Sequence, residues 1–126
     1  MNRILHALVV AALAWAAVGC SNPVQAPGDT GVCWHMATLA SGQVRFNKVS
    51  KSEPSIESCA GSLDGMRLRF MSLGGPQDIV GAYQGNFLFL NAQGIYMSQQ
   101  LNGIRYLLMV RTGDGRLVRP SEIPQQ

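Results

Sequence analysis

Apolar residues recur at three- and four-residue intervals through the middle of the chain, which is the spacing of one face of an α-helix. Before them, Ser52-Glu53-Pro54-Ser55 carries the hydroxyls, acid and proline typical of a helix start. After them, Gly74-Gly75-Pro76 is a stop signal. The pattern predicts one long helix whose apolar stripe is Ile56, Cys59, Ala60, Leu63, Met66, Phe70 and Leu73.

Shorter segments on both sides of this helix alternate between apolar and polar residues, as half-buried strands do, and turn residues separate them. One of them, Phe87-Leu88-Phe89-Leu90, is apolar on both faces and predicts a central strand. The fold class expected is α+β: an antiparallel sheet of five to seven strands, ending in a meander, with the helix on one face. The predicted strands lie within 32–40, 44–49, 79–83, 87–90, 95–99, 104–111 and 116–118.

The first twenty residues have a different pattern. An apolar run from Ile4 to Val18 follows Arg3, and it is too short to span a bilayer comfortably as a helix. The run ends in Ala16-Ala17-Val18-Gly19-Cys20, which resembles the lipobox of bacterial lipoprotein precursors, with Ala17 where these usually carry Leu. The resemblance implies that residues 1–19 are removed as a signal peptide and that Cys20 becomes the lipidated N-terminus. The alternatives are an ordinary secretory signal and a short membrane anchor.

The same resemblance implies a location. Two or three acyl chains on Cys20 would hold the protein stably on a membrane. Ser21 follows where an Asp would retain the protein at the inner membrane, so the outer membrane of a diderm bacterium is expected, on its periplasmic side. The inner membrane and the cell surface are the alternatives. Residues 20–31, rich in Pro and Gly, are expected to form a flexible tether, 32–120 a single domain and 121–126 a frayed tail.

The cysteine count fits export. The chain has three cysteines, and removing the lipidated Cys20 leaves one pair, Cys33 and Cys59. In an oxidising compartment such a pair is expected to form a disulfide. Cys59 lies within the apolar stripe, which favours a bridge in the core. The alternative is a copper-type metal site made of Cys33, His35, Met36 and Cys59, but this cluster lacks the repeated spacing of metal motifs, and we expect no metal and no cofactor.

Charge and motifs exclude several functions. The formal net charge is +3, with no dense basic block, so nucleic acid is not an expected partner. His35 is the one histidine after the signal peptide, and the chain contains no nucleophile elbow, P-loop or zinc-protease motif. We therefore expect a protein that is not an enzyme.

Two surfaces are candidates for binding. Arginine and tyrosine are favoured at protein interfaces, and the C-terminal strands carry Tyr96, Arg105, Tyr106, Arg111 and Arg116, with Arg119 beyond them. The other candidate is a groove at Gly61 and Gly65, opposite the apolar stripe of the helix. Alternatively, the arginines line a solvated strand face and the glycines are merely tolerated. Near that groove, Asp64 and Arg67 are expected to form an exposed ion pair of little energetic weight.

These observations favour a non-enzymatic, periplasm-facing lipoprotein that serves as a binding or assembly subunit of the cell envelope. Its expected partners are the membrane, through the N-terminal lipid, and an envelope protein. The alternatives are a lipoprotein that binds a glycan or small ligand in a pocket between helix and sheet, and one that modulates an enzyme as protease inhibitors do.

Overall fold

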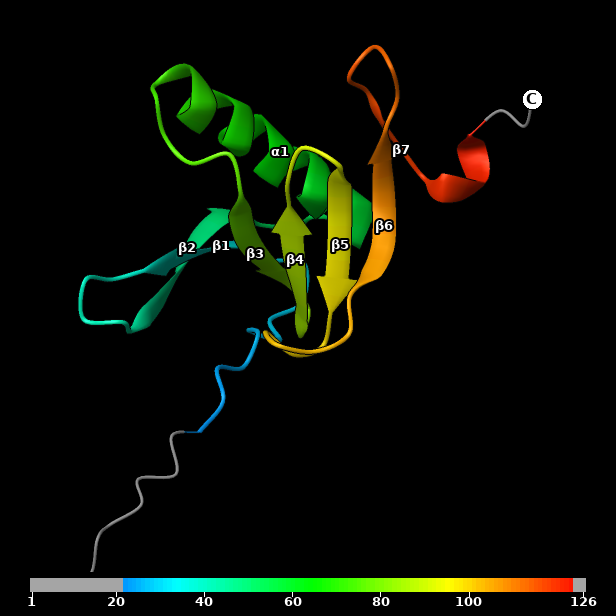
Figure 1. Cartoon of the computed structure of the whole chain (residues 1–126). Helices are drawn as coiled ribbons and strands as arrows, with labels where there is room; N and C mark the ends of the chain where they lie inside the picture. Colours follow the sequence, from blue (N-terminus) through cyan, green and yellow to red (C-terminus); the bar gives the residue numbers. More distant parts are fainter. Residues whose placement is uncertain (1–21, 124–126) are drawn as a thin grey trace, which may run out of the picture.

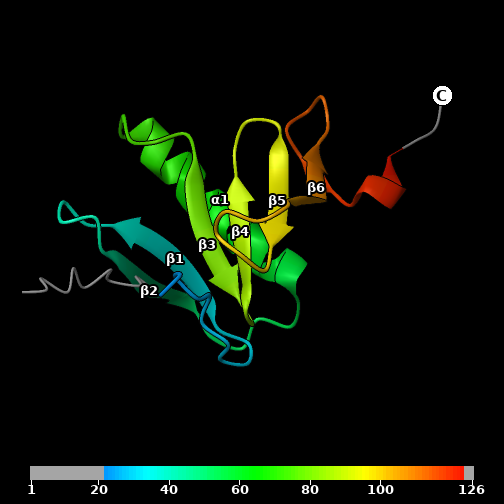
Figure 2. The same ribbon diagram turned by 60° about the horizontal axis from the view of Figure 1, so that its bottom comes forward.

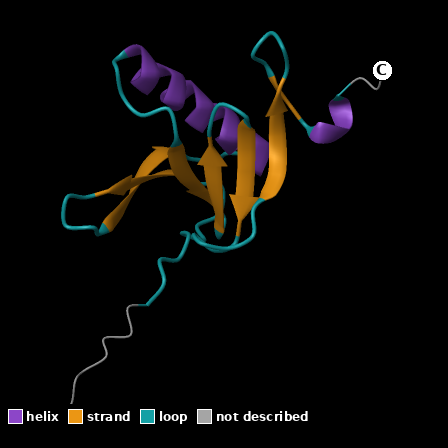
Figure 3. Cartoon of the chain, viewed as in Figure 1, coloured by secondary structure: helices purple, strands orange, loops and turns teal. Residues whose placement is uncertain are grey.

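A seven-stranded antiparallel sheet, with one helix packed across one face, makes up most of residues 22–123, the part of the chain that this computed structural model describes (Figures 1 and 3). The strand order across the sheet is β2-β1-β3-β4-β5-β6-β7, and this confirms the predicted α+β class. The elements are β1 Cys33–Thr38, β2 Val44–Ser50, α1 Ile56–Ser72, β3 Ile79–Tyr83, β4 Asn86–Leu90, β5 Gly94–Ser98, β6 Tyr106–Arg111, β7 Leu117–Val118 and the 3₁₀ helix η1 Pro120–Glu122.

The start and stop signals of α1 act as the sequence predicts. The Ser55 hydroxyl accepts a hydrogen bond from the backbone N–H of Ser58 at 3.1 Å, which satisfies one free donor of the first turn. At the other end Gly74 has a φ of 78°, a left-handed conformation that glycine adopts at low cost. The Gly75 N–H donates to the Phe70 carbonyl at 2.7 Å and closes the helix.

The core lies between α1 and the centre of the sheet. Cys59, Ala60 and Leu63 of the helix are fully buried against strand residues that include Leu88 and Ile95. Leu63 can approach β3 closely because position 81 is glycine: a Cβ there would lie 2.3 Å from a Leu63 methyl group.

The apolar stripe predicted for the helix is largely correct: Cys59, Ala60 and Leu63 are in the core, Ile56 and Phe70 pack against it, and Met66 is half-buried. Leu73 lies just after the last helical residue and is 85% exposed. The buried face also includes Asp64 and Arg67, which were expected on the surface. The buried face of the helix is therefore wider than predicted, and it includes two charged side chains beside the apolar stripe.

The face of the sheet opposite α1 has a small aromatic core of its own. Phe87 and Phe89 of β4 are buried there although no helix covers them. The ring of Phe46 lies 6.4 Å from that of Phe87, and the Arg105 guanidinium lies 3.6 Å from the centre of the Phe89 ring. Figure 2 shows the β5–β6 loop, which carries Arg105, crossing over β4. This explains why β4 is apolar on both faces.

Part of the predicted tether is bonded to the domain. Within 22–31, the Pro27 carbonyl accepts from the Gly85 N–H at 2.9 Å, and the Gly31 carbonyl accepts from the Glu53 N–H at 2.8 Å. The Gly31 N–H donates to the Gln84 side chain at 2.9 Å. The segment has no helix or strand, but from Pro27 onward these bonds hold it against the β3–β4 turn.

At its other end, the described chain finishes in η1, which contains the start of the predicted frayed tail 121–126. Positions 124–126 lie outside the described residues. No helix within 22–123 is both long enough and apolar enough to cross a bilayer.

Glu53 ties together the segments that meet at the start of the helix. Its carboxylate accepts hydrogen bonds from the hydroxyls of Ser50, Ser58 and Ser62, at 2.6 Å for Ser50 and 2.9 Å for Ser62. Its backbone carbonyl accepts from the Tyr83 hydroxyl at 2.7 Å. The Ser50 hydroxyl first, and then the other two, hold the pKa of Glu53 below its ordinary value of 4.5.

This arrangement predicts a pH dependence of folding. Because the folded-state pKa of Glu53 is lowered, its contribution to stability is present above pH 4.5 and is lost as the pH falls through the lowered pKa. Between about pH 6 and about pH 3, urea unfolding should show a larger loss of stability for wild type than for Glu53→Gln. Parallel pH curves for the two proteins would contradict this role.

Candidate ligand-binding cleft

Five segments of the chain meet at one end of the sheet. The pairing of Cys33 with Tyr83, Phe87 with Ser98 and Met97 with Tyr106 places the start of β1, the β3–β4 turn and the β5–β6 loop at the same end. The start of α1 and the segment 22–31 reach this end as well, and Figure 1 shows the N-terminal segment leaving from it.

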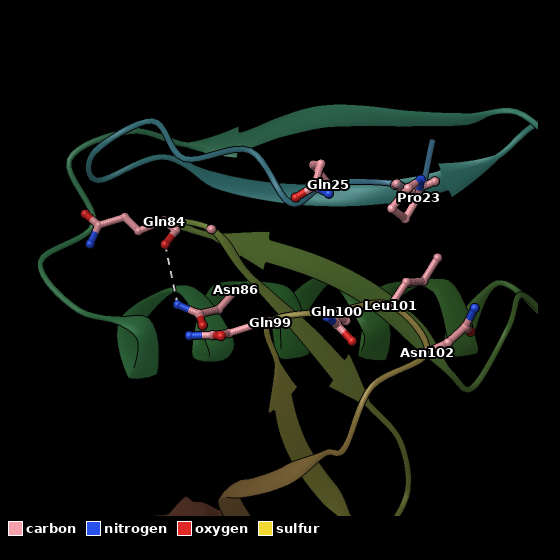
Figure 4. A pocket seen from close by; sticks show the side chains of 10 residues that line it. Pro23, Gln25, Gln84, Asn86, Gln99, Gln100, Leu101 and Asn102 are labelled. Carbon is pink, nitrogen blue, oxygen red and sulfur yellow. Dashed lines mark hydrogen bonds between the residues drawn. The ribbon is translucent and has the colours of Figure 1, made fainter. Parts of the chain in front are cut away.

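A cleft of about 670 Å³ lies between the N-terminal segment and the loop after β5. Figure 4 shows Pro23 and Gln25 across from the side chains of the β5–β6 loop. Most of the lining side chains are carboxamides, each with two N–H donors and a carbonyl acceptor. The six are Gln25, Gln84, Asn86, Gln99, Gln100 and Asn102, and the other lining residues are Pro23, Val24, Gly85 and Leu101.

The cleft wall is neutral. None of the described residues that line it is acidic, basic or a histidine. It can therefore offer hydrogen bonds but no counter-charge and no titrating group. This chemistry suits binding of a neutral polar molecule and offers no group for acid–base or nucleophilic catalysis.

Two smaller hollows of about 400 Å³ each continue the cleft. One shares Asn86, Gln99 and Gln100 with it and adds Ile104 and Tyr106. The Tyr106 side chain is 64% exposed, so its ring is available beside the amides. The other hollow adjoins Pro54–Glu57 at the start of α1 and also includes Asn86.

Backbone and side-chain bonds fix the wall that the β3–β4 turn and the β5–β6 loop form. The Gln84 carboxamide oxygen accepts from Gly31, and its backbone has a φ of 44° in a tight turn. The Asn86 amide donates to the Gln84 carbonyl at 3.4 Å, the bond drawn in Figure 4. The Gln100 N–H donates to the Ser98 hydroxyl at 3.2 Å. These bonds preform the wall made by residues 84–86 and 99–102, whereas residues 23–25 of the opposite wall precede Pro27, where the bonds to the domain begin.

The predicted arginine and tyrosine surface is not brought together on one face. Arg111 turns toward the helix and forms a two-bond ion pair with Asp64, at 3.0 and 2.7 Å. Arg105 stacks on Phe89 on the opposite face of the sheet. Arg116 pairs with Asp114 at 2.8 Å in the β6–β7 turn, and Arg119 pairs with Glu122 at η1.

The two tyrosines also separate. Tyr96 pairs with Phe89 in the sheet, on the face that carries Arg105, and is half-buried. Tyr106 lines the hollow beside the cleft. Of the predicted surface, Tyr106 is thus the residue that reaches the amide-lined end.

The helix groove predicted at Gly61 and Gly65 is open. No atom lies within 4 Å of where a Gly61 Cβ would stand, and only an Arg69 nitrogen, at 3.9 Å, approaches that of Gly65. Among the described residues, no packing contact therefore requires glycine at either position.

Cys33 and Cys59 are joined in a disulfide with a Cα–Cα distance of 5.4 Å. The bridge removes both thiols from the alternative metal set with His35 and Met36. The His35 ring contacts Phe70 edge to face at 5.6 Å, and burial lowers its pKa. Cys20, the residue predicted to be lipidated, lies outside the described residues.

The six carboxamides were not predicted as site residues. The strand ranges predicted from the sequence leave residues 84–86 and 100–103 as turns, and the structure has turns there, with Asn86 as the first residue of β4. A turn signal, however, does not say which turns meet. The available signal was the concentration of Gln and Asn in two turns that an antiparallel meander places at the same end.

No family model, curated protein or solved structure matches this chain.

Proposed function

We propose that this protein is a lipoprotein that Cys20 anchors to the outer membrane, where it faces the periplasm as a non-enzymatic binding or assembly subunit of the envelope. The observation that carries the proposal is the sequence at the end of the apolar run, with Gly19 before Cys20 and Ser21 after it. The bridge between Cys33 and Cys59 supports it, because such disulfides persist in exported proteins.

A second candidate function is glycan or small-ligand binding, and the amide-lined cleft favours it. A cleft of about 670 Å³ falls in the size range of ligand sites, and its polar groups converge from separate segments. The two functions are compatible, since an anchored protein can also bind a ligand.

Mass spectrometry of the N-terminal peptide tests the anchor. Protein extracted from membranes should begin at Cys20 and carry two or three acyl chains, and Cys20→Ala should carry none. Cys33→Ala, which removes a cysteine after the lipobox, should keep the acyl chains and serves as the control. An unmodified N-terminus at another residue in wild type would overturn the proposal.

A further inference from the structure

We infer that the cleft between residues 23–25 and the loop 99–102 binds a neutral oligosaccharide. The inference specifies the ligand for the proposed binding role and does not depend on the lipid at Cys20. A sugar chain presents hydroxyl groups that are both donors and acceptors, a few ångströms apart and without charge. Five carboxamides around the cleft present the complementary groups, while that of Gln84 points away and is bonded to Gly31 (Figure 4).

The neutrality of the wall argues for a neutral ligand. A phosphate, a carboxylate or an ammonium group needs a counter-charge or several directed bonds to offset the loss of its water. The described lining residues offer the bonds of amides alone. Hydroxyl and acetamido groups lose less hydration free energy than charged groups when they leave water. Carboxamides can replace the hydrogen bonds to water that they give up.

The size and the flanking ring fit a chain of sugars better than a single one. The cleft of about 670 Å³ is continuous, through Asn86, Gln99 and Gln100, with a hollow of about 400 Å³. At that hollow the exposed Tyr106 offers a flat apolar face. The C–H face of a sugar ring can stack on such a ring while its hydroxyls reach the amides.

A peptide is a less suitable occupant. Extended peptides are commonly bound by pairing with an edge strand, and here the edges are β2 and β7. None of the described residues that line the cleft belongs to either strand, because the cleft lies at the strand ends. Three apolar residues, Pro23, Val24 and Leu101, line the cleft, and the other side chains there are carboxamides.

The test uses side-chain amide signals in nitrogen–proton NMR spectra of the ¹⁵N-labelled full chain, purified in detergent. Chitotriose, a neutral trimer of N-acetylglucosamine, and maltotriose are the sugar probes, and tetra-alanine amide is the peptide probe. With at least one of the sugars we expect the NH₂ signals of Gln99 and Asn102 to shift in a saturable way. The NH₂ signal of Gln93, in the β4–β5 turn at the other end of the sheet, should stay in place.

Two sets of variants test the same contacts. The double change Gln99→Ala and Asn102→Ala removes exposed side chains, so the fold should be kept, and the Kd should rise at least about tenfold through loss of two or more hydrogen bonds. Tyr106→Ala should also weaken binding, through loss of the stacking face. Gln93→Ala, the matched control, should leave the Kd unchanged.

Three outcomes would overturn the inference: no shift with either sugar at millimolar concentration, equal weakening by Gln93→Ala, or binding of tetra-alanine amide in place of both sugars. Because the measurement is made whatever the N-terminus carries, a negative result leaves the lipid anchor standing. An unmodified Cys20 would likewise leave the sugar site standing.

Discussion

Replacing Arg111 by alanine is expected to lower the free energy of unfolding by about 3–5 kcal/mol, because it leaves the Asp64 carboxylate without its main partner in a buried position. The Arg111 guanidinium makes two bonds to Asp64 and two to the Asn91 carbonyl, at 3.1 and 3.0 Å. It thereby joins α1, the turn after β4 and strand β6. Urea denaturation monitored by circular dichroism would measure the loss.

Arg67 belongs to the same cluster. One of its terminal nitrogens lies 3.8 Å from Asp64, and its Nε donates to the Gln77 carbonyl before β3. Because the Arg67 to Asp64 contact is long, Arg67 should compensate for the loss of Arg111 only in part. The expected loss is a large fraction of the 5–15 kcal/mol typical of a whole domain.

Arg116→Ala is the matched control, since Arg116 also pairs with an aspartate but its side chain is 75% exposed. Its expected effect is at most about 1 kcal/mol. A double-mutant cycle with Asp64→Ala should give a coupling between positions 64 and 111 of about 1–3 kcal/mol. A loss for Arg111→Ala no larger than that for Arg116→Ala would show that the pair is not stabilising.

Removing the disulfide, by Cys33→Ala together with Cys59→Ala, is the second large expected effect, at about 3.5 kcal/mol. The bridge joins residues 26 apart, and closing a loop of that length restricts the unfolded chain by about this amount. In a domain of this size, the melting temperature should fall by roughly 4–8 °C for each kcal/mol lost. Both sulfurs are buried, so the alanines also leave a small void.

Cys20→Ala is the control for this experiment because it changes a cysteine and leaves the bridge in place. It should unfold like wild type in the same detergent. Reduction of the wild-type protein should reproduce the loss seen in the double variant. Unchanged denaturation after full reduction would mean that the bridge contributes nothing to stability.

The parts of the fold that depend on neighbouring residues were predictable from the sequence. The hydroxyl of Ser55 and the glycine at position 74 determine where α1 begins and ends, through bonds within a few residues. The alternation and turns of residues 79–118 determine the meander in the same way. The Cys33–Cys59 bridge followed from a count of cysteines and from the place of Cys59 in the stripe.

The Asp64 and Arg111 pair was not predictable on the same grounds. Each residue type is usually exposed when considered alone, and the two are 47 positions apart. Burial became favourable only because the fold places an aspartate on the helix opposite an arginine on β6. A pattern of single residues contains no information about such a match, so the sequence assigned both to the surface.

The cleft was missed for a related reason. Its walls come from a segment before β1, a turn after β3 and a loop after β5, and no one of these contains a motif. Tyr106 was singled out as part of an arginine-rich surface, but the structure places it beside the amides instead. Sites of this kind depend on which turns coincide in space, and that is a property of topology.

The docking of the N-terminal segment has a consequence for reach. Pro23, at the wall of the cleft, follows Cys20 by three residues, which can span at most about 10 Å. If Cys20 is acylated as proposed, the cleft is confined to the layer of solvent directly above the lipid headgroups. The anchor would then restrict binding by distance from the membrane, since a polymer held farther from the surface could not contact the amides. Selectivity would come partly from this distance.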